Sequence, residues 1–364
     1  MAKKIFIAAT GQNCGKTTTS IGLMHLALKK YRRVGFIKPL GPKPTIFHRY
    51  SVDKDAALIA QVFGLEKDLR WMSPVVVHPD TTRKVVDGEI SPSDLHERII
   101  RAYTELEKSC DFIIIEGSGH PGVGSVMKTS NGRIARLLDA PVLMVTGGGL
   151  GNVVDKIYMG LALFEKEGVH VRAVLANKLI PEKRDRTLDY LTRALADEKM
   201  TVIGGIDYHP VLANPTLRRV SKLLGLPLQG NKREMSRIIQ HIQIGAASTQ
   251  RVTELIQDPS LLIVTSSRDE LLVTLANLYK IPAYRSRIVG LVIPGISPIS
   301  TITQMILDRS NIPYIRAEKH TTAALHRIIT EDVSKITAAD TEKLGLIRNL
   351  AETYIDFDLL DALF

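Results

Sequence analysis

The sequence predicts an α/β protein with a doubly wound, mostly parallel sheet, followed by a second, smaller α/β domain. Short β-branched runs without polar alternation recur along the chain, which is typical of strands buried on both faces of a parallel sheet. Segments of helical period separate these runs, as the crossovers between parallel strands require. The 364 residues, 45% of them hydrophobic, suffice for two domains of the usual ~100–200 residues.

The larger domain is expected over residues 1–215. Its strand candidates, in chain order, are "KIFIAA", "RVGFIKP", "DFIIIEG", "APVLMVTGGG", "VRAVLANKL" and "TVIGGID". The prolines, glycines and basic side chains between Pro210 and about Arg233 suggest a connection between domains, so residues 216–232 are predicted to form a linker.

The smaller domain is expected over residues 233–335. It contains the strand candidates "SLLIVTSS", "IVGLVIPG" and "IPYIRAE", each followed by a helical segment such as "DELLVTLANLY" or "TTAALHRII". Residues 336–364 are predicted to form a C-terminal helical tail, with Thr337 or Asp340 as the capping residue.

Charge and cysteine content narrow the class of partner. The net charge is +10 and the pI is near 9.5, but the 48 Lys and Arg residues are spread along the chain, which favours phosphorylated small molecules over nucleic acid. Cys14 and Cys110 form no CxxC pair or metal-ligand spacing. Neither a signal peptide nor a run of ~18 apolar residues is found. We therefore expect a cytoplasmic protein without a membrane anchor.

Residues 9–20, "ATGQNCGKTTTS", predict a phosphate-binding loop between the first strand and the first helix. Such a loop presents backbone N–H groups and the positive end of the helix dipole to an anion. Thr10 replaces the first glycine of the common pattern, but Gly11 still allows close backbone approach. Lys16 would reach the β and γ phosphates and the Thr17 hydroxyl would ligate Mg²⁺. The alternative is that "GKT" only starts a helix.

Three further polar residues follow strands or open a helix. Glu116 ends "DFIIIEG", where its carboxylate would emerge at the carboxyl edge of the sheet and bind a metal. Asp55 opens a helical segment, so it is equally suited to metal binding and to capping that helix. Lys38 ends the second strand and is either a site residue or an ordinary exposed lysine. His120, in the glycine-rich loop after Glu116, is a candidate base or a loop residue lining the cleft.

As a set, these residues resemble the dethiobiotin synthetase family of P-loop ligases. The stretches that carry the resemblance are "IAATGQNCGKTTTS", "GFIKPL", "DKDAALIAQ" and "FIIIEGSG". The resemblance implies a P-loop NTPase sheet with ATP and Mg²⁺ as cofactors.

The same resemblance implies a role for each matching residue. Thr17, Asp55 and Glu116 would hold Mg²⁺. Lys16 and Lys38 would be catalytic, with Lys38 meeting the reacting carboxylate or carbamate and the phosphate. Asn177, in "LANK", would recognise the base, and its surroundings lack the aspartate common in guanine sites, so we expect ATP. The expected nucleotide-binding residues are Gly11, Gln12, Asn13, Cys14, Gly15, Lys16, Thr17, Thr18 and Asn177.

The chain also departs from that family. Pro42 stands where the substrate loop usually offers a hydroxyl, and "GSGHPGVGSVMKT" replaces an aromatic-containing loop and a Pro-Leu-Ser element. These differences argue against dethiobiotin synthesis itself.

The second domain resembles a DRTGG domain, although the name-giving run survives only as "SSRDE" at 266–270. The order of the two domains resembles the N-terminal region of long bacterial phosphotransacetylases, without their acetyl-transferring domain, for which no ~300-residue segment remains after residue 335. Arg268 and Asp269 are candidates for an allosteric or interface site, or form a surface ion pair.

These observations leave two main hypotheses. The first is a Mg-ATP-binding ATPase whose DRTGG-like domain makes it a nucleotide-dependent metabolic regulator of a partner enzyme. The second is an ATP-dependent ligase or amidotransferase-like enzyme that activates a substrate carboxylate as an acyl phosphate. A scaffold role is disfavoured because Lys16, Thr17, Asp55 and Glu116 are all present. A homodimer or higher homo-oligomer is expected in either case.

Overall fold

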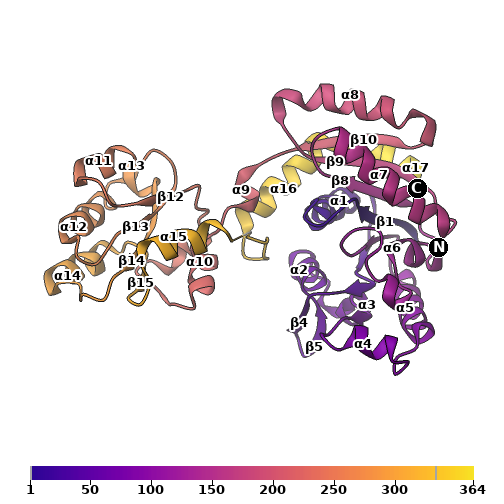
Figure 1. Cartoon of the computed structure of the whole chain (residues 1–364), viewed down its shortest axis with the longest axis horizontal. Coiled ribbons are helices and arrows are strands. Elements are labelled where there is room, and N and C mark those ends of the chain that lie inside the picture. Colours follow the sequence, from indigo (N-terminus) through magenta and orange to yellow (C-terminus); the bar gives the residue numbers. More distant parts are fainter. Residues whose placement is uncertain (1, 333) are drawn as a thin grey trace. The chain divides into compact units, whose positions relative to one another are not determined.

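The computed structural model of the chain describes residues 2–332 and 334–364 and consists of two compact units (Figure 1). The first unit comprises Met1–Tyr208 together with Leu344–Phe364, and the second comprises His209–Lys343. The chain therefore leaves the first unit, builds the second, and returns to the first.

The first unit contains a six-stranded sheet in the order β10-β9-β8-β1-β7-β2, with every pairing parallel. All six predicted strands are confirmed, and so is the doubly wound α/β fold. The strands are β1 (Lys3–Ala9), β2 (Val34–Ile37), β7 (Phe112–Glu116), β8 (Val142–Thr146), β9 (Val171–Leu179) and β10 (Thr201–Asp207). The longer helices are α1 (Lys16–Lys30), α2 (Lys54–Phe63), α5 (Pro92–Glu107), α6 (Asn131–Leu137), α7 (Gly151–Lys166) and α8 (Arg184–Ala194).

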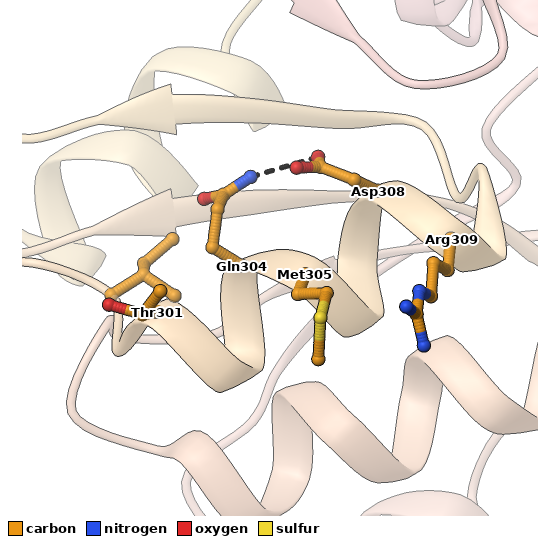
Figure 2. Close-up of a pocket in the computed structure, with 6 residues that line it drawn as sticks. Thr301, Gln304, Met305, Asp308 and Arg309 are labelled. Carbon is orange, nitrogen blue, oxygen red and sulfur yellow. Dashed lines mark hydrogen bonds between the residues drawn. The ribbon is translucent and has the colours of Figure 1, made fainter.

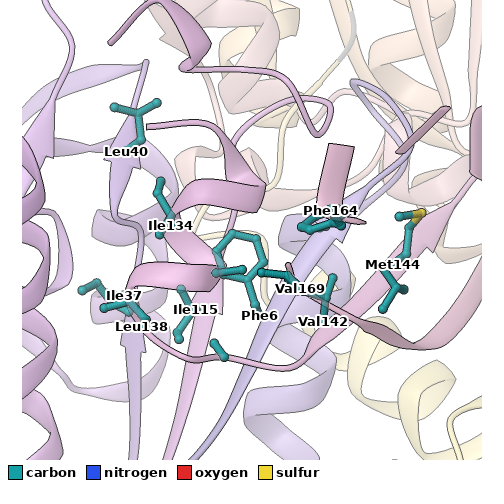
Figure 3. Packing of buried hydrophobic residues seen from close by; sticks show 14 of the residues in the cluster. Phe6, Ile37, Leu40, Ile115, Ile134, Leu138, Val142, Met144, Phe164 and Val169 are labelled. Atoms are coloured by element: carbon teal, nitrogen blue, oxygen red, sulfur yellow. The ribbon is translucent and has the colours of Figure 1, made fainter. Parts of the chain in front are cut away.

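Successive strand residues point to opposite faces of this sheet, and both faces are covered. Phe6 of β1 and Ile115 of β7 belong to a cluster that also includes Ile134 of α6 and Phe164 of α7 (Figure 3). Helix α1 contacts β1 and β7, and its Leu23 is fully buried. Each fully buried side chain of this size stabilises the fold by about 1.5–3 kcal/mol, so the sheet is a rigid support for the loops at its carboxyl edge.

Between β2 and α5 the chain adds small elements, before and after α2, that the sequence analysis did not predict. Two two-stranded sheets form, one from β3 (Leu40–Gly41) and β6 (Val75–Val76) and the other from β4 (Pro44–Phe47) and β5 (Tyr50–Asp53). The short helix α3 (Leu69–Met72) lies before β6, and α4 (Thr81–Val86) lies after it. The β4–β5 turn consists of His48 at φ 45° and Arg49 at φ 70°. Two left-handed residues are what a tight hairpin turn of this length requires.

The second unit is a smaller α/β unit, as predicted. Its sheet has the order β11-β15-β14-β13-β12, in which β12 to β15 run parallel and β11 antiparallel. The strands are β11 (Leu228–Gln229), β12 (His241–Ile244), β13 (Ser260–Ile263), β14 (Ile288–Pro294) and β15 (Tyr314–Ala317). The helices are α9 (Pro210–Ala213), α10 (Leu217–Leu224), α11 (Thr249–Glu254), α12 (Asp269–Leu278), α13 (Pro282–Arg285), α14 (Thr301–Ser310) and α15 (Thr322–Thr330).

Residues 216–232, expected as a linker, instead form α10 and β11 of the second unit. Leu217 is fully buried in its core, and Leu228 and Gln229 pair with β15. The prolines and glycines that suggested a linker lie in the turns around these short elements. A short amphipathic helix between turns is hard to distinguish from a linker by pattern.

The C-terminal residues form α16 (Thr341–Tyr354) and α17 (Phe357–Leu363). Rather than extending as a tail, α17 contacts α1, β9 and β10. Its Asp361 carboxylate lies 2.8 Å from Lys3 Nζ, 2.9 Å from Lys30 Nζ and 2.6 Å from the Tyr31 hydroxyl. These contacts lower the pKa of Asp361 to about 2, against the opposing effect of burial. The segment is thus an integral part of the first unit.

Candidate functional site

The loop between β1 and α1 lies at the carboxyl edge of the sheet. Gly15 has φ 95°, in the left-handed region, and its carbonyl accepts the first helical bond from Thr19 N at 2.8 Å. At the start of the loop, Thr10 N donates to Val145 O at 3.0 Å and the Thr10 hydroxyl donates to Thr146 Oγ1 at 3.4 Å. Thr10 is therefore accommodated by β8, and the missing glycine does not disrupt the loop.

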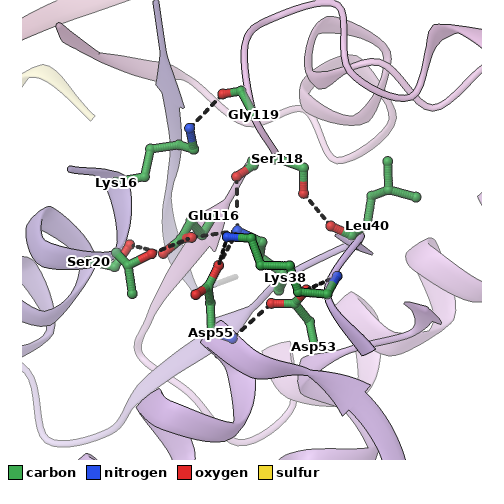
Figure 4. A network of polar contacts seen from close by, with 12 residues as sticks. Lys16, Ser20, Lys38, Leu40, Asp53, Asp55, Glu116, Ser118 and Gly119 are labelled. Carbon is green, nitrogen blue, oxygen red and sulfur yellow. Dashed lines mark hydrogen bonds and ion pairs between the residues drawn. The ribbon is translucent and has the colours of Figure 1, made fainter. Parts of the chain in front are cut away.

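Lys16, the first residue of α1, is folded back over the loop. Its Nζ donates to Gly119 O at 2.5 Å and to Gly11 O at 3.4 Å (Figure 4). Burial lowers the pKa of Lys16 to about 8, despite the opposing attraction of Glu116. Within the described residues, the hydrogen bonds of the Lys16 ammonium go to backbone carbonyls, and such a buried cation would gain from the charge of a phosphate group.

A second lysine, Lys38, lies between two carboxylates (Figure 4). Its Nζ is 2.5 Å from Glu116 Oε1 and 3.2 Å from Asp55 Oδ2, and it also donates to Gly117 O at 3.2 Å. Burial alone would lower the pKa of Lys38, but Glu116 and Asp55 together raise it above the usual lysine value. Lys38 is therefore a buried, charged residue of the site and not an exposed surface lysine.

Glu116 is held from both sides of its carboxylate. Ser20 Oγ donates to Oε2 at 2.6 Å, and Thr17 Oγ1 donates to Oε1 at 3.4 Å. The sequence analysis did not identify Ser20, although it follows Thr17 by three residues and so lies on the same face of α1. Ser20 and Glu116 are both fully buried, so this contact fixes the carboxylate.

The capping residue of α2 is Asp53, not Asp55. Asp53 Oδ1 accepts from Asp55 N at 2.8 Å, and Oδ2 accepts from Lys43 N at 2.9 Å. Burial, reinforced by the neighbouring Asp55, raises the pKa of Asp53. Because the cap is supplied two residues earlier, the Asp55 carboxylate can lie 3.5 Å from Lys43 Nζ and 3.2 Å from Lys38 Nζ.

The oxygen ligands expected for Mg²⁺ suit that ion. Thr17 offers a hydroxyl, and Asp55 and Glu116 offer carboxylates, the donor type that Mg²⁺ prefers. Within the described residues, no cluster of three or more His, Cys, Asp or Glu side chains could hold a metal by itself.

The loop after Glu116 is held by Asn131. Its Oδ1 accepts from Ser118 N at 3.0 Å, and its Nδ2 donates to Ser118 O at 2.9 Å and to His120 O at 3.0 Å. The exposed His120 ring accepts from Gly122 N at 3.2 Å. These contacts of His120 shape a turn and involve none of Lys16, Lys38, Asp55 and Glu116.

The other expected nucleotide residues surround the same loop. Gln12 and Asn13 are exposed, whereas Cys14 and Thr18 are half-buried. Asn177, near the end of β9, donates from Nδ2 to Cys14 O at 2.8 Å. The structure therefore brings every candidate residue of the first unit to one edge of the sheet, and their roles stay predictions.

In the second unit, Arg268 and Asp269 are used within the fold. Arg268 donates to Gly245 O and Ala247 O at 3.1 Å each and pairs with Glu270 at 2.5 Å. Asp269 accepts from Thr303 Oγ1 at 2.7 Å. Their role as an allosteric or interface site stays a prediction.

A shallow groove of about 680 Å³ runs along α14 of the second unit (Figure 2). In it, Gln304 Nε2 donates to Asp308 Oδ1 at 2.9 Å. The lining residues are Ile299, Thr301, Gln304, Met305, Asp308 and Arg309.

The described part of the chain contains no helix that is long and apolar enough to span a membrane.

Comparison with known proteins places the first unit in a family context. A family model described as "AAA domain" matches residues 3–216. The phosphate acetyltransferase of Nitratidesulfovibrio vulgaris is 22% identical over 365 residues, covering 98% of this chain and 51% of that protein. The ATP-dependent dethiobiotin synthetase of Clostridium kluyveri is 29% identical over 192 residues, covering 49% of this chain and 75% of that protein.

Among solved structures, the MinD cell division protein of Aquifex aeolicus is similar at 16% identity and a TM-score of 0.36, covering 58% of this chain and 84% of that one. The chain spans about half the length of the phosphate acetyltransferase it matches over most of its own length.

Proposed function

The chain belongs to the family described as AAA domain over residues 3–216, and from that membership we propose that its first unit binds and hydrolyses ATP with Mg²⁺. The observation that carries the proposal is the convergence of Lys16, Lys38, Asp55 and Glu116 beside a left-handed Gly15 at the start of α1. A helix N-terminus with free N–H groups and buried cations is an anion site by its electrostatics.

Each residue has a defined task in this proposal. The loop from Gly11 to Thr18 wraps the phosphates, and the Lys16 ammonium exchanges its carbonyl partners for β- and γ-phosphate oxygens. Thr17, Asp55 and Glu116 would hold Mg²⁺, which when bound neutralises phosphate charge. Ser20 keeps the Glu116 carboxylate oriented toward Thr17. Lys38 is the second cation available to charge that develops during phosphoryl transfer.

We further propose that the protein is a cytoplasmic, nucleotide-dependent metabolic regulator whose second unit is a DRTGG-like domain acting on a partner enzyme. The similarity to phosphate acetyltransferases over 98% of this chain supports it, because the match extends through both units. The connection of the chain between the units also supports it. Helix α16 begins at Thr341 in the second unit, and its Ala351, in the first unit, packs against Gly22 of α1. A homodimer or higher homo-oligomer is part of the same proposal.

The alternative is an ATP-dependent ligase in which a substrate carboxylate attacks the γ phosphate. It is favoured by the burial of Lys38, since a cation at the end of β2 could orient such an oxygen, and by the 29% identity to a dethiobiotin synthetase.

The first test is calorimetric binding of Mg-ATP to the wild type and to Lys16→Ala, with ADP release measured in the same samples. We expect binding that the substitution weakens at least ten-fold, and slow turnover. Equal binding by both proteins, or none by the wild type, would refute the site.

The second test adds a panel of carboxylates and, separately, analytical sedimentation with and without Mg-ATP. Stimulation of ADP release by one carboxylate supports the ligase. A nucleotide-dependent change in assembly, without such stimulation, supports the regulator.

A further inference from the structure

The Asn177 side chain is held by two backbone groups. Its Nδ2 donates to Cys14 O at 2.8 Å, and its Oδ1 accepts from Lys178 N at 2.8 Å. Because Lys178 N can only donate, the amide oxygen must face it, which leaves Nδ2 to face the Cys14 carbonyl. The side chain is 5% exposed, so the amide orientation is fixed by the fold.

The same amide packs against the next residue of the loop. A Cβ added to Gly15 would lie 2.0 Å from Asn177 Nδ2, closer than any real contact. The peptide between Cys14 and Gly15 is planar and trans, so its C=O and N–H point in opposite directions. Anchoring the Cys14 carbonyl on Asn177 therefore turns the Gly15 N–H away from β9.

The end of β9 is itself supported by its neighbour β8. A Cβ on Gly148 would lie 2.3 Å from Lys178 O, so the loop after β8 packs directly on the backbone beside Asn177. The first residue of the phosphate loop, Thr10, is bonded to Val145 O at 3.0 Å. The loop is thus tied to β8 at its start and to β9 at its end.

We propose that Asn177 is a positioning residue, which holds the Cys14–Gly15 peptide so that the Gly15 N–H faces the phosphates, rather than a residue that selects the base. This inference rests on the proposed ATP site. It predicts that loss of the Asn177 amide weakens every ligand that carries the phosphate chain, whatever base is attached.

The test compares Mg-ATP with inorganic tripolyphosphate and Mg²⁺ by calorimetry. In Asn177→Ala and Asn177→Ser, both ligands should bind about ten-fold more weakly, the effect of losing one hydrogen bond of about 1.4 kcal/mol. The control Asn277→Ala removes an exposed amide that also donates to a backbone carbonyl, Val273 O, and should change neither affinity. Weaker ATP binding with unchanged tripolyphosphate binding would assign Asn177 to the base and overturn the inference.

A second measurement needs no nucleotide. In a Cys110→Ser background, Cys14 is the one remaining cysteine of the 364 residues, and its thiol is half-buried. Releasing its carbonyl should loosen the loop, so Asn177→Ala should speed labelling of Cys14 by a thiol reagent several-fold, while melting temperature reports that the protein is folded. An unchanged labelling rate would overturn the inference. A third outcome separates the two proposals. If the wild type binds neither ligand but Asn177→Ala still labels faster at Cys14, the proposed ATP site is refuted, whereas the contact between Asn177 and the Cys14 carbonyl is supported.

Discussion

Replacing Lys38 by methionine should destabilise the first unit strongly. Methionine fills a similar volume but leaves Glu116, which is fully buried, and Asp55, whose side chain is 12% exposed, without their shared cation. Removing one partner of a buried ion pair typically costs about 3–5 kcal/mol because the remaining charge is uncompensated. We expect a loss in this range in the free energy of unfolding near pH 7.

The matched control is Lys43→Met. Lys43 Nζ lies 3.5 Å from the same Asp55, but its side chain is 42% exposed. Exposed pairs contribute only about 0–1 kcal/mol, so this variant should be close to wild type. The contrast separates the effect of burial from that of the contact itself.

Urea unfolding of the two variants and the wild type, followed by circular dichroism, measures both values. Adding Mg²⁺ should recover more stability in Lys38→Met than in the wild type, because the variant lacks the cation that lies 2.5 Å from the buried Glu116 carboxylate. Equal losses for the two variants, or a loss below about 1 kcal/mol for Lys38→Met, would refute the reasoning that Lys38 neutralises this cluster.

Predictions for three other residues can be tested by calorimetric binding of Mg-ATP or by urea unfolding. Because burial lowers the pKa of Lys16 to about 8, the affinity for Mg-ATP should fall by up to ten-fold per pH unit above pH 8. A Mg-ATP affinity that stays constant above pH 8 in calorimetry would contradict this prediction. The variant Lys16→Met, which lacks the titrating ammonium, is the control. Gly15→Ala should lower Mg-ATP affinity more than ten-fold, since the methyl group meets Asn177 and φ is 95°; near-normal calorimetric binding would show that the loop adapts. The pKa of Asp361 is lowered to about 2, so its contribution is present above about pH 4 and is lost as pH falls toward 2. Asp361→Asn should therefore be about 1 kcal/mol less stable than wild type at pH 7, with the gap closing in acid; a pH-independent gap in urea unfolding would argue against the charge contacts.

The strands of both units were predictable where burial on two faces produced unbroken apolar runs. "DFIIIEG" became β7 with Glu116 at its end, and "GFIKPL" became β2 followed by Lys38. The β4–β5 hairpin was not predictable, because His48 and Arg49 adopt left-handed conformations that usually signal glycine or asparagine. A local bond from Lys43 N to Asp53 Oδ2, at 2.9 Å, closes the open end of this hairpin.

The site was predictable in position but not in its internal contacts. Sequence order places Lys38, Asp55 and Glu116 near one sheet edge, yet it cannot say that the lysine lies between the carboxylates. It also left Asp55 open as a metal ligand or a helix cap and did not consider Asp53, which two residues earlier supplies the cap. Ser20 was missed because a serine inside a helix has no distinctive pattern until its partner is known.

The return of the chain to the first unit has a consequence for biosynthesis. Residues 209–343 are translated before α17 supplies Asp361 to Lys3, Lys30 and Tyr31. At the usual ~5–20 residues per second, an emerging first unit waits on the order of ten seconds for its last helix. During that interval the parts of α1, of β9 and of the edge strand β10 that α17 contacts lack their cover, so a ribosome stalled within the second unit would leave the first unit without its last helix.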